Sequence, residues 1–281
     1  MKVAIASGKG GTGKTTVATN LAYVGSRNGR TVVYIDCDVE EPNGHIFLKP
    51  DLDGATSVGT LVPKVDDSKC TYCGDCGDIC QYSAIVAVGQ AVLVFGELCH
   101  GCGGCSLVCP SGAISEVLHE TGEVQVGSAG PIAFAHGSLK VGQAMSPPVI
   151  KAVKAAAPPA DMVIVDAPPG TSCPVIESVR DCDFLLLVTE PTPFGLNDLK
   201  LAVAMAREME LPFGVVINRA DLGDRETHLY CGSNDIEILS EIPDDRKIAE
   251  AYSRGELAGE VLPDYRRIFE ALLGRIELKA D

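Results

Sequence analysis

The sequence predicts a doubly wound α/β domain with a mostly parallel central sheet. Short apolar runs rich in Val and Ile have the length and composition of strands that are buried on both faces. Longer segments with apolar residues at helical spacing separate these runs, which is typical of helices that cover a parallel sheet. The clearest strand-like runs are Val3–Ala6, Thr31–Ile35, Met162–Val165, Phe184–Val188 and Phe213–Ile217.

A cysteine-rich segment from Pro63 to Gly127 interrupts this alternation. It contains an internal repeat in which every cysteine of a first run recurs 29 residues later in a second run. Residues 64–127 also carry eight acidic side chains against two lysines. We therefore expect a small inserted α+β domain at residues 63–127, within a main domain formed by residues 1–62 and 128–281.

Bulk composition narrows the possible partners. The chain has 281 residues, 46% of them hydrophobic, and a formal net charge of −15. Such a charge argues against nonspecific binding to nucleic acid, which needs clustered Lys and Arg. No apolar run has the length of a membrane span or of a signal-peptide core. We expect a cytoplasmic protein without stable membrane insertion, whose reduced cysteines bind metal rather than form disulfides.

The stretch GKGGTGKT, from Gly8 to Thr15, fits the phosphate-binding pattern G-x-x-x-x-G-K-[ST]. It lies between a predicted strand and a helix that should begin near Lys14. Its glycines allow backbone N–H groups to surround phosphates, while Lys14 neutralises their charge and Thr15 binds Mg²⁺. Thr16 is placed to reach the α-phosphate. The expected nucleotide-binding residues of this loop are Gly10, Gly11, Thr12, Gly13, Lys14, Thr15 and Thr16.

Acidic residues follow two of the predicted strands. Asp36 and Asp38 lie in YIDCDVEEPN, and Asp166 ends the apolar run of MVIVDAPPG. Ligands of open α/β sheets bind at the carboxyl ends of the strands, so Asp166 is expected to bind Mg²⁺ through water. The alternative for Asp36 and Asp38 is that they cap the next helix.

Each cysteine run has the spacing C-x₂-C-x₂-C-x₃-C of bacterial ferredoxins. In that arrangement the fourth cysteine of one run ligates the cluster of the other run, so two [4Fe–4S] clusters are expected. A pair of zinc sites is the alternative. Gln81 replaces the proline that often follows the first run. The expected ligands are Cys70, Cys73, Cys76 and Cys109 for cluster one, and Cys99, Cys102, Cys105 and Cys80 for cluster two.

The loop KGGTGKT resembles the deviant phosphate loop of the MinD/ParA/Mrp and nitrogenase iron-protein class. This resemblance implies a homodimer that encloses ATP, in which Lys9 reaches the phosphates bound by the partner chain. YIDCDVEEPN resembles switch I of the same class, which implies that Asp38 orients or activates the attacking water and that Asp36 lies near Mg²⁺.

Two later stretches continue the resemblance. DAPPG is similar to switch II of the Mrp-like branch and assigns that role to Pro168, Pro169 and Gly170. VVINRAD, with Asn218 and Arg219, and EIPDDRKIAEAYSRG resemble the segments that recognise and flank adenine. Cys173 lies seven residues after Asp166, where the nitrogenase iron protein has a cluster ligand, but we favour a structural or weakly reactive thiol there.

The order of these motifs over nearly the whole chain resembles MinD-superfamily P-loop ATPases that carry an inserted ferredoxin domain. The resemblance implies ATP hydrolysis that is slow and stimulated by a partner, with Mg²⁺, ATP or ADP and two [4Fe–4S] clusters bound. The first functional hypothesis is that the nucleotide state gates electron transfer to or from a partner protein with a basic docking patch. The alternatives are an iron–sulfur cluster carrier of the Mrp type and a positioning ATPase with redox-sensing clusters.

Overall fold

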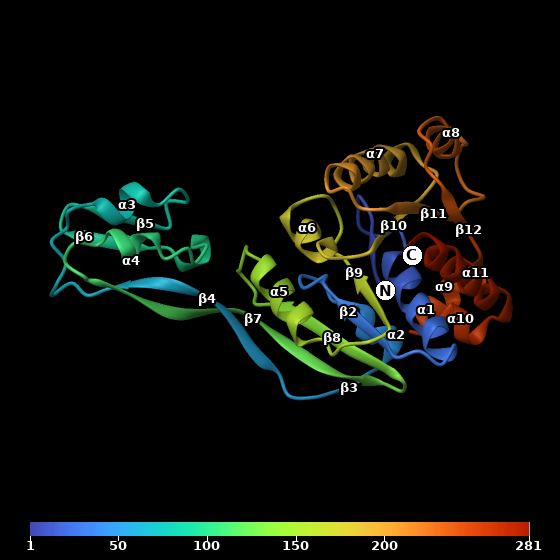
Figure 1. Cartoon of the computed structure of the whole chain (residues 1–281), viewed down its shortest axis with the longest axis horizontal. Helices are drawn as coiled ribbons and strands as arrows, with labels where there is room; N and C mark the ends of the chain where they lie inside the picture. Colours follow the sequence, from blue (N-terminus) through green and yellow to red (C-terminus); the bar gives the residue numbers. More distant parts are fainter. Residues whose placement is uncertain (281) are drawn as a thin grey trace. The chain divides into compact units, whose positions relative to one another are not determined.

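The computed structural model describes residues 1–280 and contains two compact units. The first unit comprises Met1–Ala55, Val124–Ser138 and the chain from Ile150 onward. The second unit comprises Thr56–Glu123 and Leu139–Val149, and it contains both cysteine runs. In Figure 1 the second unit carries α3, α4, β5 and β6.

The first unit is built on a sheet with the strand order β12-β11-β10-β1-β9-β2-β8-β7-β3. The seven strands from β12 to β8 are parallel, whereas β3 pairs antiparallel with β7. This topology confirms the predicted doubly wound, mostly parallel sheet. The strands are β1 (Lys2–Ala6), β2 (Val32–Asp36), β3 (Asp51–Leu52), β7 (Ile114–Ala129), β8 (Ile132–Leu139), β9 (Met162–Asp166), β10 (Phe184–Thr189), β11 (Phe213–Asn218) and β12 (Ile238–Ile242). Only residues 124–129 of β7 belong to the first unit.

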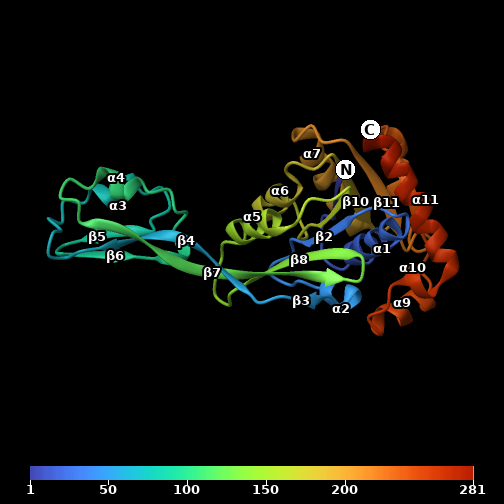
Figure 2. The ribbon, with the colours of Figure 1, turned by 60° about the horizontal axis from the view of Figure 1, so that its bottom comes forward.

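Helices cover both faces of this sheet. Figures 1 and 2 show α1 and α11 on one face and α6 and α7 on the other. The parallel strands require such crossover helices, since each must return to the same end of the sheet before the next strand begins. The helices outside the cysteine runs are α1 (Lys14–Arg27), α2 (Gly44–Leu48), α5 (Pro147–Ala156), α6 (Cys173–Val179), α7 (Pro193–Glu208), α8 (Glu226–Ser233), α9 (Arg246–Ser253), α10 (Ala258–Val261) and α11 (Pro263–Ala280).

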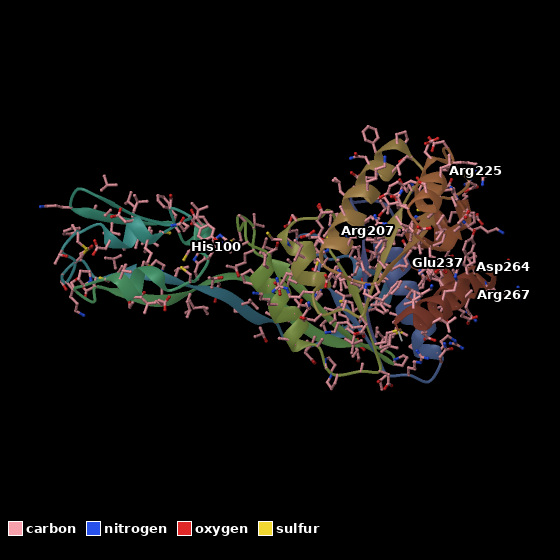
Figure 3. All side chains as sticks on the ribbon, turned by 45° about the horizontal axis from the view of Figure 1, so that its top comes forward. His100, Arg207, Arg225, Glu237, Asp264 and Arg267 are labelled. Carbon is pink, nitrogen blue, oxygen red and sulfur yellow. The ribbon has the colours of Figure 1, made fainter. Side chains whose placement is uncertain are left out.

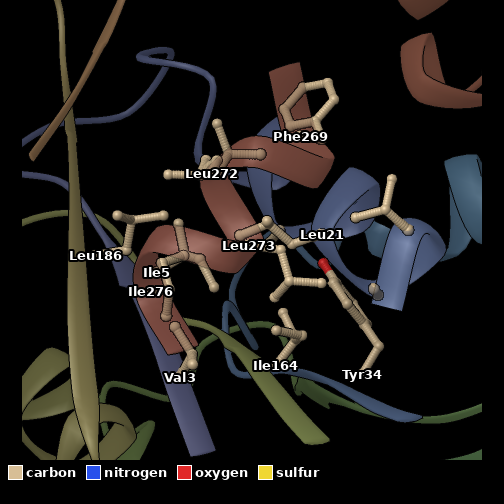
Figure 4. Packing of buried hydrophobic residues seen from close by; sticks show 14 of the residues in the cluster. Val3, Ile5, Leu21, Tyr34, Ile164, Leu186, Phe269, Leu272, Leu273 and Ile276 are labelled. Carbon is tan, nitrogen blue, oxygen red and sulfur yellow. The ribbon is translucent and has the colours of Figure 1, made fainter. Parts of the chain in front are cut away.

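The C-terminal helix α11 contributes a complete apolar stripe to the core (Figure 4). Its buried residues Phe269, Leu272, Leu273 and Ile276 follow the i, i+3, i+4, i+7 spacing of one helix face. They join Leu21 of α1 and the inward-facing residues of the strands in one cluster. Each fully buried side chain of this kind stabilises the fold by about 1.5–3 kcal/mol. Within residues 1–280, no helix is both long and apolar enough to span a membrane.

The second unit repeats its local structure as it repeats its sequence. Helices α3 (Asp75–Ile79) and α4 (Gly104–Val108) start at the same point of the two cysteine runs and pack on each other. A left-handed glycine precedes each helix, Gly74 with φ of 94° and Gly103 with φ of 71°. Strands β5 (Ile85–Val88) and β6 (Ala91–Val94) form an antiparallel hairpin, and β4 (Thr56–Val65) pairs with β7.

Candidate functional site

The phosphate loop joins β1 to α1 and is fixed from both sides. The Ser7 hydroxyl donates to the carbonyl of Lys9 at 2.6 Å, and the Asn218 side-chain amide donates to the carbonyl of Thr12 at 2.9 Å. Gly13 has φ of 93°, and a Cβ atom there would lie 2.4 Å from Nδ2 of Asn218. Glycine is therefore the residue that allows both the left-handed turn and the close approach of Asn218.

Beside this loop lies a cavity of about 370 Å³, formed entirely by the first unit. A volume of this order is typical of small-molecule and cofactor sites. The loop residues that line the cavity are Gly10, Gly11, Gly13, Lys14, Thr15 and Thr16. The expected residues from other segments that line it are Asp38, Pro169, Asn218 and Arg219.

Several residues around the cavity were not among the expected site residues. Asp244 and Asp245 lie between β12 and α9, and Ile248 and Tyr252 lie in α9, a segment whose sequence resembles only an adenine-flanking loop. Glu41 and Asn43 come from the chain after β2. Of the expected residues, Lys9, Thr12, Asp36, Asp166, Pro168 and Gly170 do not line this cavity.

Asp36 and Asp166 lie opposite each other where β2 and β9 end, and both are fully buried. Burial raises the pKa of Asp36, and the charge of Asp166 raises it further, while backbone N–H groups of Gly44 and Asp38 oppose the shift. Burial also raises the pKa of Asp166, against the charge of Lys14 and the hydroxyls of Thr15 and Tyr34. Two adjacent buried carboxylates are stable as anions only with a cation nearby.

A free carboxylate oxygen makes this pair suitable for Mg²⁺. Within residues 1–280, Oδ1 of Asp166 is buried and has no hydrogen-bond partner. Hard oxygen donors of this kind are the ligands that Mg²⁺ prefers, directly or through its waters. Thr15, Asp36 and Asp166 therefore fit a bound Mg²⁺, whose charge would stabilise the phosphates of a nucleotide.

Asp38 differs from this buried pair because it reaches the cavity. Burial raises its pKa to about 6, and the positive charge of Lys14 opposes the shift. A carboxylate of this pKa is ionised at neutral pH and can accept a hydrogen bond from a water molecule in the cavity.

Lys9 faces an acidic residue of its own chain instead of the cavity. Its Nζ lies 3.8 Å from Oε2 of Glu190, which is nearly buried after β10. The other oxygen of Glu190 lies 3.0 Å from Nη1 of Arg219, and Nε of Arg219 lies 3.6 Å from Asp244. The segment expected to act as switch II also contacts the loop, since the backbone N–H of Gly170 donates to the carbonyl of Ser7 at 2.9 Å.

The second unit contains two narrow cavities, each lined by four cysteines that come from both runs. The first is lined by Cys70, Cys73, Cys76 and Cys109. The second is lined by Cys80, Cys99, Cys102 and Cys105. In both cavities the fourth cysteine of one run has crossed to the other three, which is the distribution of ligands expected for two clusters.

The surroundings of the crossing cysteines favour thiolates. The Ser111 hydroxyl lowers the pKa of Cys109, as does the backbone N–H of Ala113, which donates to the Cys109 sulfur at 3.3 Å. Burial raises the pKa of Cys80, but backbone N–H groups from Tyr82 to Ile85 outweigh it and the net shift is downward. N–H···S contacts also stabilise sulfur ligands of iron–sulfur clusters, so the donor atoms of both cavities suit such a group.

The thiols do not converge on single points. Within residues 1–280, no three His, Cys, Asp or Glu side chains are grouped as they would be around one metal ion. A four-iron cluster binds each thiolate to a different iron atom, so its ligands stand further apart than those of a single ion. The ring of His100, labelled in Figure 3, stacks on Tyr82 with centroids 3.5 Å apart beside the second cavity.

The remaining cysteines do not line either cavity. Cys37, Cys182 and Cys231 are buried in the first unit, and burial raises the pKa of each thiol. Cys173 is exposed at the start of α6.

Comparison with known proteins agrees with the fold and the phosphate loop. Residues 3–258 match the CobQ/CobB/MinD/ParA nucleotide binding domain. The chain belongs to this family. An uncharacterized protein of Methanocaldococcus jannaschii is 32% identical over 266 residues, which cover 91% of this chain and 90% of that protein.

More distant relatives of this ATPase family carry functional names. A protein of Pyrococcus abyssi named iron-sulfur cluster carrier protein is 26% identical over 271 residues, covering 90% of this chain and 77% of that protein. Among solved structures, the septum site-determining protein MinD of Pyrococcus horikoshii with Mg-ADP superimposes with a TM-score of 0.60. The two chains are 21% identical, and the superposition covers 98% of this chain and 95% of the other.

Two residues that contact expected site residues, Tyr34 and Glu190, were also not predicted from the sequence. Tyr34 lies inside a strand-like run, where an aromatic residue predicts only core packing. Glu190 follows β10 as one acidic residue among many. Their partners, Asp166 and Lys9, are 132 and 181 residues away along the chain, so no local pattern connects them.

Proposed function

We propose that this protein is an ATPase that binds Mg·ATP in its first unit and holds two [4Fe–4S] clusters in residues 63–127. The observation that carries the proposal is the pair of cavities with four cysteines each, drawn crosswise from two runs. Chance folding of a cysteine-rich segment gives no reason for this exchange of the fourth ligand, whereas a two-cluster site requires it.

Each part of the nucleotide site has a distinct task in the proposed reaction. Lys14 and the loop N–H groups bind the phosphates, while Thr15, Asp36 and Asp166 hold Mg²⁺. Asp38 orients the attacking water toward the γ-phosphate. Asn218 and Arg219 contact the base.

Lys9 acts across a homodimer in this proposal. In a single chain it pairs with Glu190 and does not line the cavity. The Lys9 ammonium can therefore reach a phosphate only after it separates from Glu190. The nucleotide bound by a second copy of the chain carries more negative charge than Glu190 and would attract Lys9 away from it. ATP, with its γ-phosphate, favours this exchange more than ADP does.

We propose electron transfer as the role of the clusters, with the nucleotide state as the control. When bound, such clusters supply one-electron redox chemistry. The cysteine-rich segment lies in the chain between switch I, at 36–43, and switch II, at 166–170, which are the segments that respond to a γ-phosphate. Its acidic surface favours a partner with a basic patch, because opposite charges raise the rate of encounter.

A second candidate function is delivery of an iron–sulfur cluster to an apo-protein. It is supported by the relatives that are named iron-sulfur cluster carrier proteins. In that case the clusters would be cargo, and ATP would change how firmly the cysteines hold them.

One experiment separates the two functions. The clusters are reconstituted anaerobically and titrated by EPR without nucleotide and with Mg-ATP, and iron retention is measured in parallel. The electron-transfer proposal predicts a shift of potential or spectrum with all iron retained. Loss of iron to an apo-acceptor on addition of ATP would support the carrier function. If potential, spectrum and iron content are all unchanged by ATP, both functions are overturned.

A further inference from the structure

A buried hydroxyl contacts the proposed magnesium site. Tyr34 of β2 is fully buried, and its Oη donates a hydrogen bond to Oδ2 of Asp166 at 2.9 Å. Figure 4 shows its side chain among the core residues that face α1 and α11. Phenylalanine would fill this space without a polar atom, so packing alone does not account for the hydroxyl.

The ring of Tyr34 has no freedom to move its hydroxyl elsewhere. On one side it stacks on Phe134, with ring centroids 5.6 Å apart and planes 13° from parallel. Gly44 packs closely against the hydroxyl end of the ring, where a Cβ atom would come within 2.4 Å of Cε1 and 2.6 Å of Oη. The hydroxyl is therefore held at one place, directly against Asp166.

This hydrogen bond gives the two oxygens of Asp166 different environments. Oδ2 accepts a hydrogen bond from the Tyr34 hydroxyl, whereas Oδ1 is buried without a hydrogen-bond partner in the described chain. The hydrogen bond to Oδ2 limits rotation of the carboxylate, so Tyr34, together with the Thr15 hydroxyl, sets the position of Oδ1. Outer residues that fix a metal-binding carboxylate in this way tune its affinity for the metal.

The same contact involves switch I. The backbone N–H of Gly44 donates to Oδ2 of Asp36 at 2.9 Å, while its α-carbon packs against the Tyr34 ring. Tyr34 thus touches both the glycine that supports Asp36 and the carboxylate of Asp166. Any movement of residues 36–44 that displaces Gly44 would loosen the tyrosine.

We propose that Tyr34 is a positioning residue for Mg²⁺: its hydroxyl fixes Asp166 so that Oδ1 faces the cation. The inference rests on the proposed Mg·nucleotide site and adds a determinant of metal affinity to it. Tyr34 contacts neither nucleotide nor water of the reaction in this account, and its effect passes through Asp166.

The test is the Mg²⁺ dependence of nucleotide binding in the full chain with Tyr34→Phe. Affinity for a fluorescent ADP analogue is measured in EDTA and across a Mg²⁺ titration. We expect the Mg²⁺ concentration at half-maximal enhancement to rise about tenfold, as for other outer residues of metal sites. Affinity in EDTA should stay unchanged, because Tyr34 does not line the cavity.

Tyr265→Phe is the matched control. Tyr265 is also nearly buried, and its hydroxyl also donates to a carboxylate at the cavity, Asp245, at 2.8 Å. Loss of the Tyr265 hydroxyl should leave the Mg²⁺ midpoint in place, whatever its effect on the free energy of unfolding. Tyr34→Met, which fills the core without a hydroxyl, should reproduce the shift of Tyr34→Phe and covers the case in which one variant folds poorly.

The outcomes separate this inference from the proposed function. If the wild type binds nucleotide without any effect of Mg²⁺, the proposed metal site is wrong. If the wild type depends on Mg²⁺ and Tyr34→Phe has the same midpoint, the metal site stands and the role of Tyr34 is refuted. An equal shift in Tyr265→Phe would assign the effect to general loosening and overturn the inference as well.

Discussion

Replacing Asp38 with asparagine should stabilise the metal-free protein at neutral pH while it reduces ATP hydrolysis. Burial raises the pKa of Asp38 to about 6, and Lys14 opposes that shift only in part. The ionised carboxylate is therefore held at a cost in folding free energy. Under the proposed function this cost is offset by orientation of the attacking water, which asparagine would not supply in the same way.

The size and direction of the effect follow from the pKa. A carboxyl group whose pKa is higher in the folded state binds its proton more tightly there, so it destabilises the fold as pH rises from about 4 to about 6. The shift from 3.8 to about 6 corresponds to about 3 kcal/mol at 1.4 kcal/mol per unit. Since Asp38 is partly exposed, solvent screening reduces this to about 1–2 kcal/mol.

The assay is urea unfolding in EDTA at about pH 4 and at about pH 7.5, with the wild type, Asp38→Asn and a control. Asp38→Asn should gain about 1–2 kcal/mol at the higher pH and almost nothing at the lower. Glu40→Gln removes an exposed charge two residues away and should change stability by less than about 0.5 kcal/mol at either pH. Equal or lower stability of Asp38→Asn at neutral pH would refute this reasoning.

Three further predictions concern other parts of the chain. Cys109→Ser should remove the EPR signal and iron of one cluster only, whereas Cys173→Ser keeps all iron; equal losses would contradict the assignment of ligands. Leu272→Ala, at a position 1% exposed, should lower the free energy of unfolding by about 2–5 kcal/mol in urea, against less than about 0.5 kcal/mol for Leu278→Ala on the exposed face. Lys9→Ala should abolish ATP-dependent dimers in light scattering and leave ADP affinity within about threefold, and persistence of the dimer would exclude its action across the interface.

The strands that could be predicted are those whose buried residues form a contiguous apolar run in the sequence. β1, β9 and β10 are covered on both faces, so their apolar residues need no partner in the sequence to be recognised. β8 escaped prediction because IAFAHGSL mixes Gly, His and Ser with its apolar residues. It is a strand because it pairs with β2, and such pairing is not visible in a local window.

The same distinction applies to the site. The phosphate loop and the cysteine runs are local patterns. Because the fourth cysteine of each ferredoxin-type run ligates the cluster of the other run, the spacing also predicts which distant thiols share a cavity. The contacts of Tyr34 with Asp166 and of Glu190 with Lys9 join separate strand ends. They depend on the strand order of the folded sheet, which places β2 beside β9 and β10 beside β1.

The central claim is that the two cysteine-lined cavities hold one [4Fe–4S] cluster each. It is tested most directly by anaerobic reconstitution followed by iron and sulfide analysis with Mössbauer spectroscopy of the full chain. We expect about eight iron and eight inorganic sulfide atoms per chain, all in four-iron clusters. Zinc without sulfide, or no more than four iron atoms per chain, would contradict it.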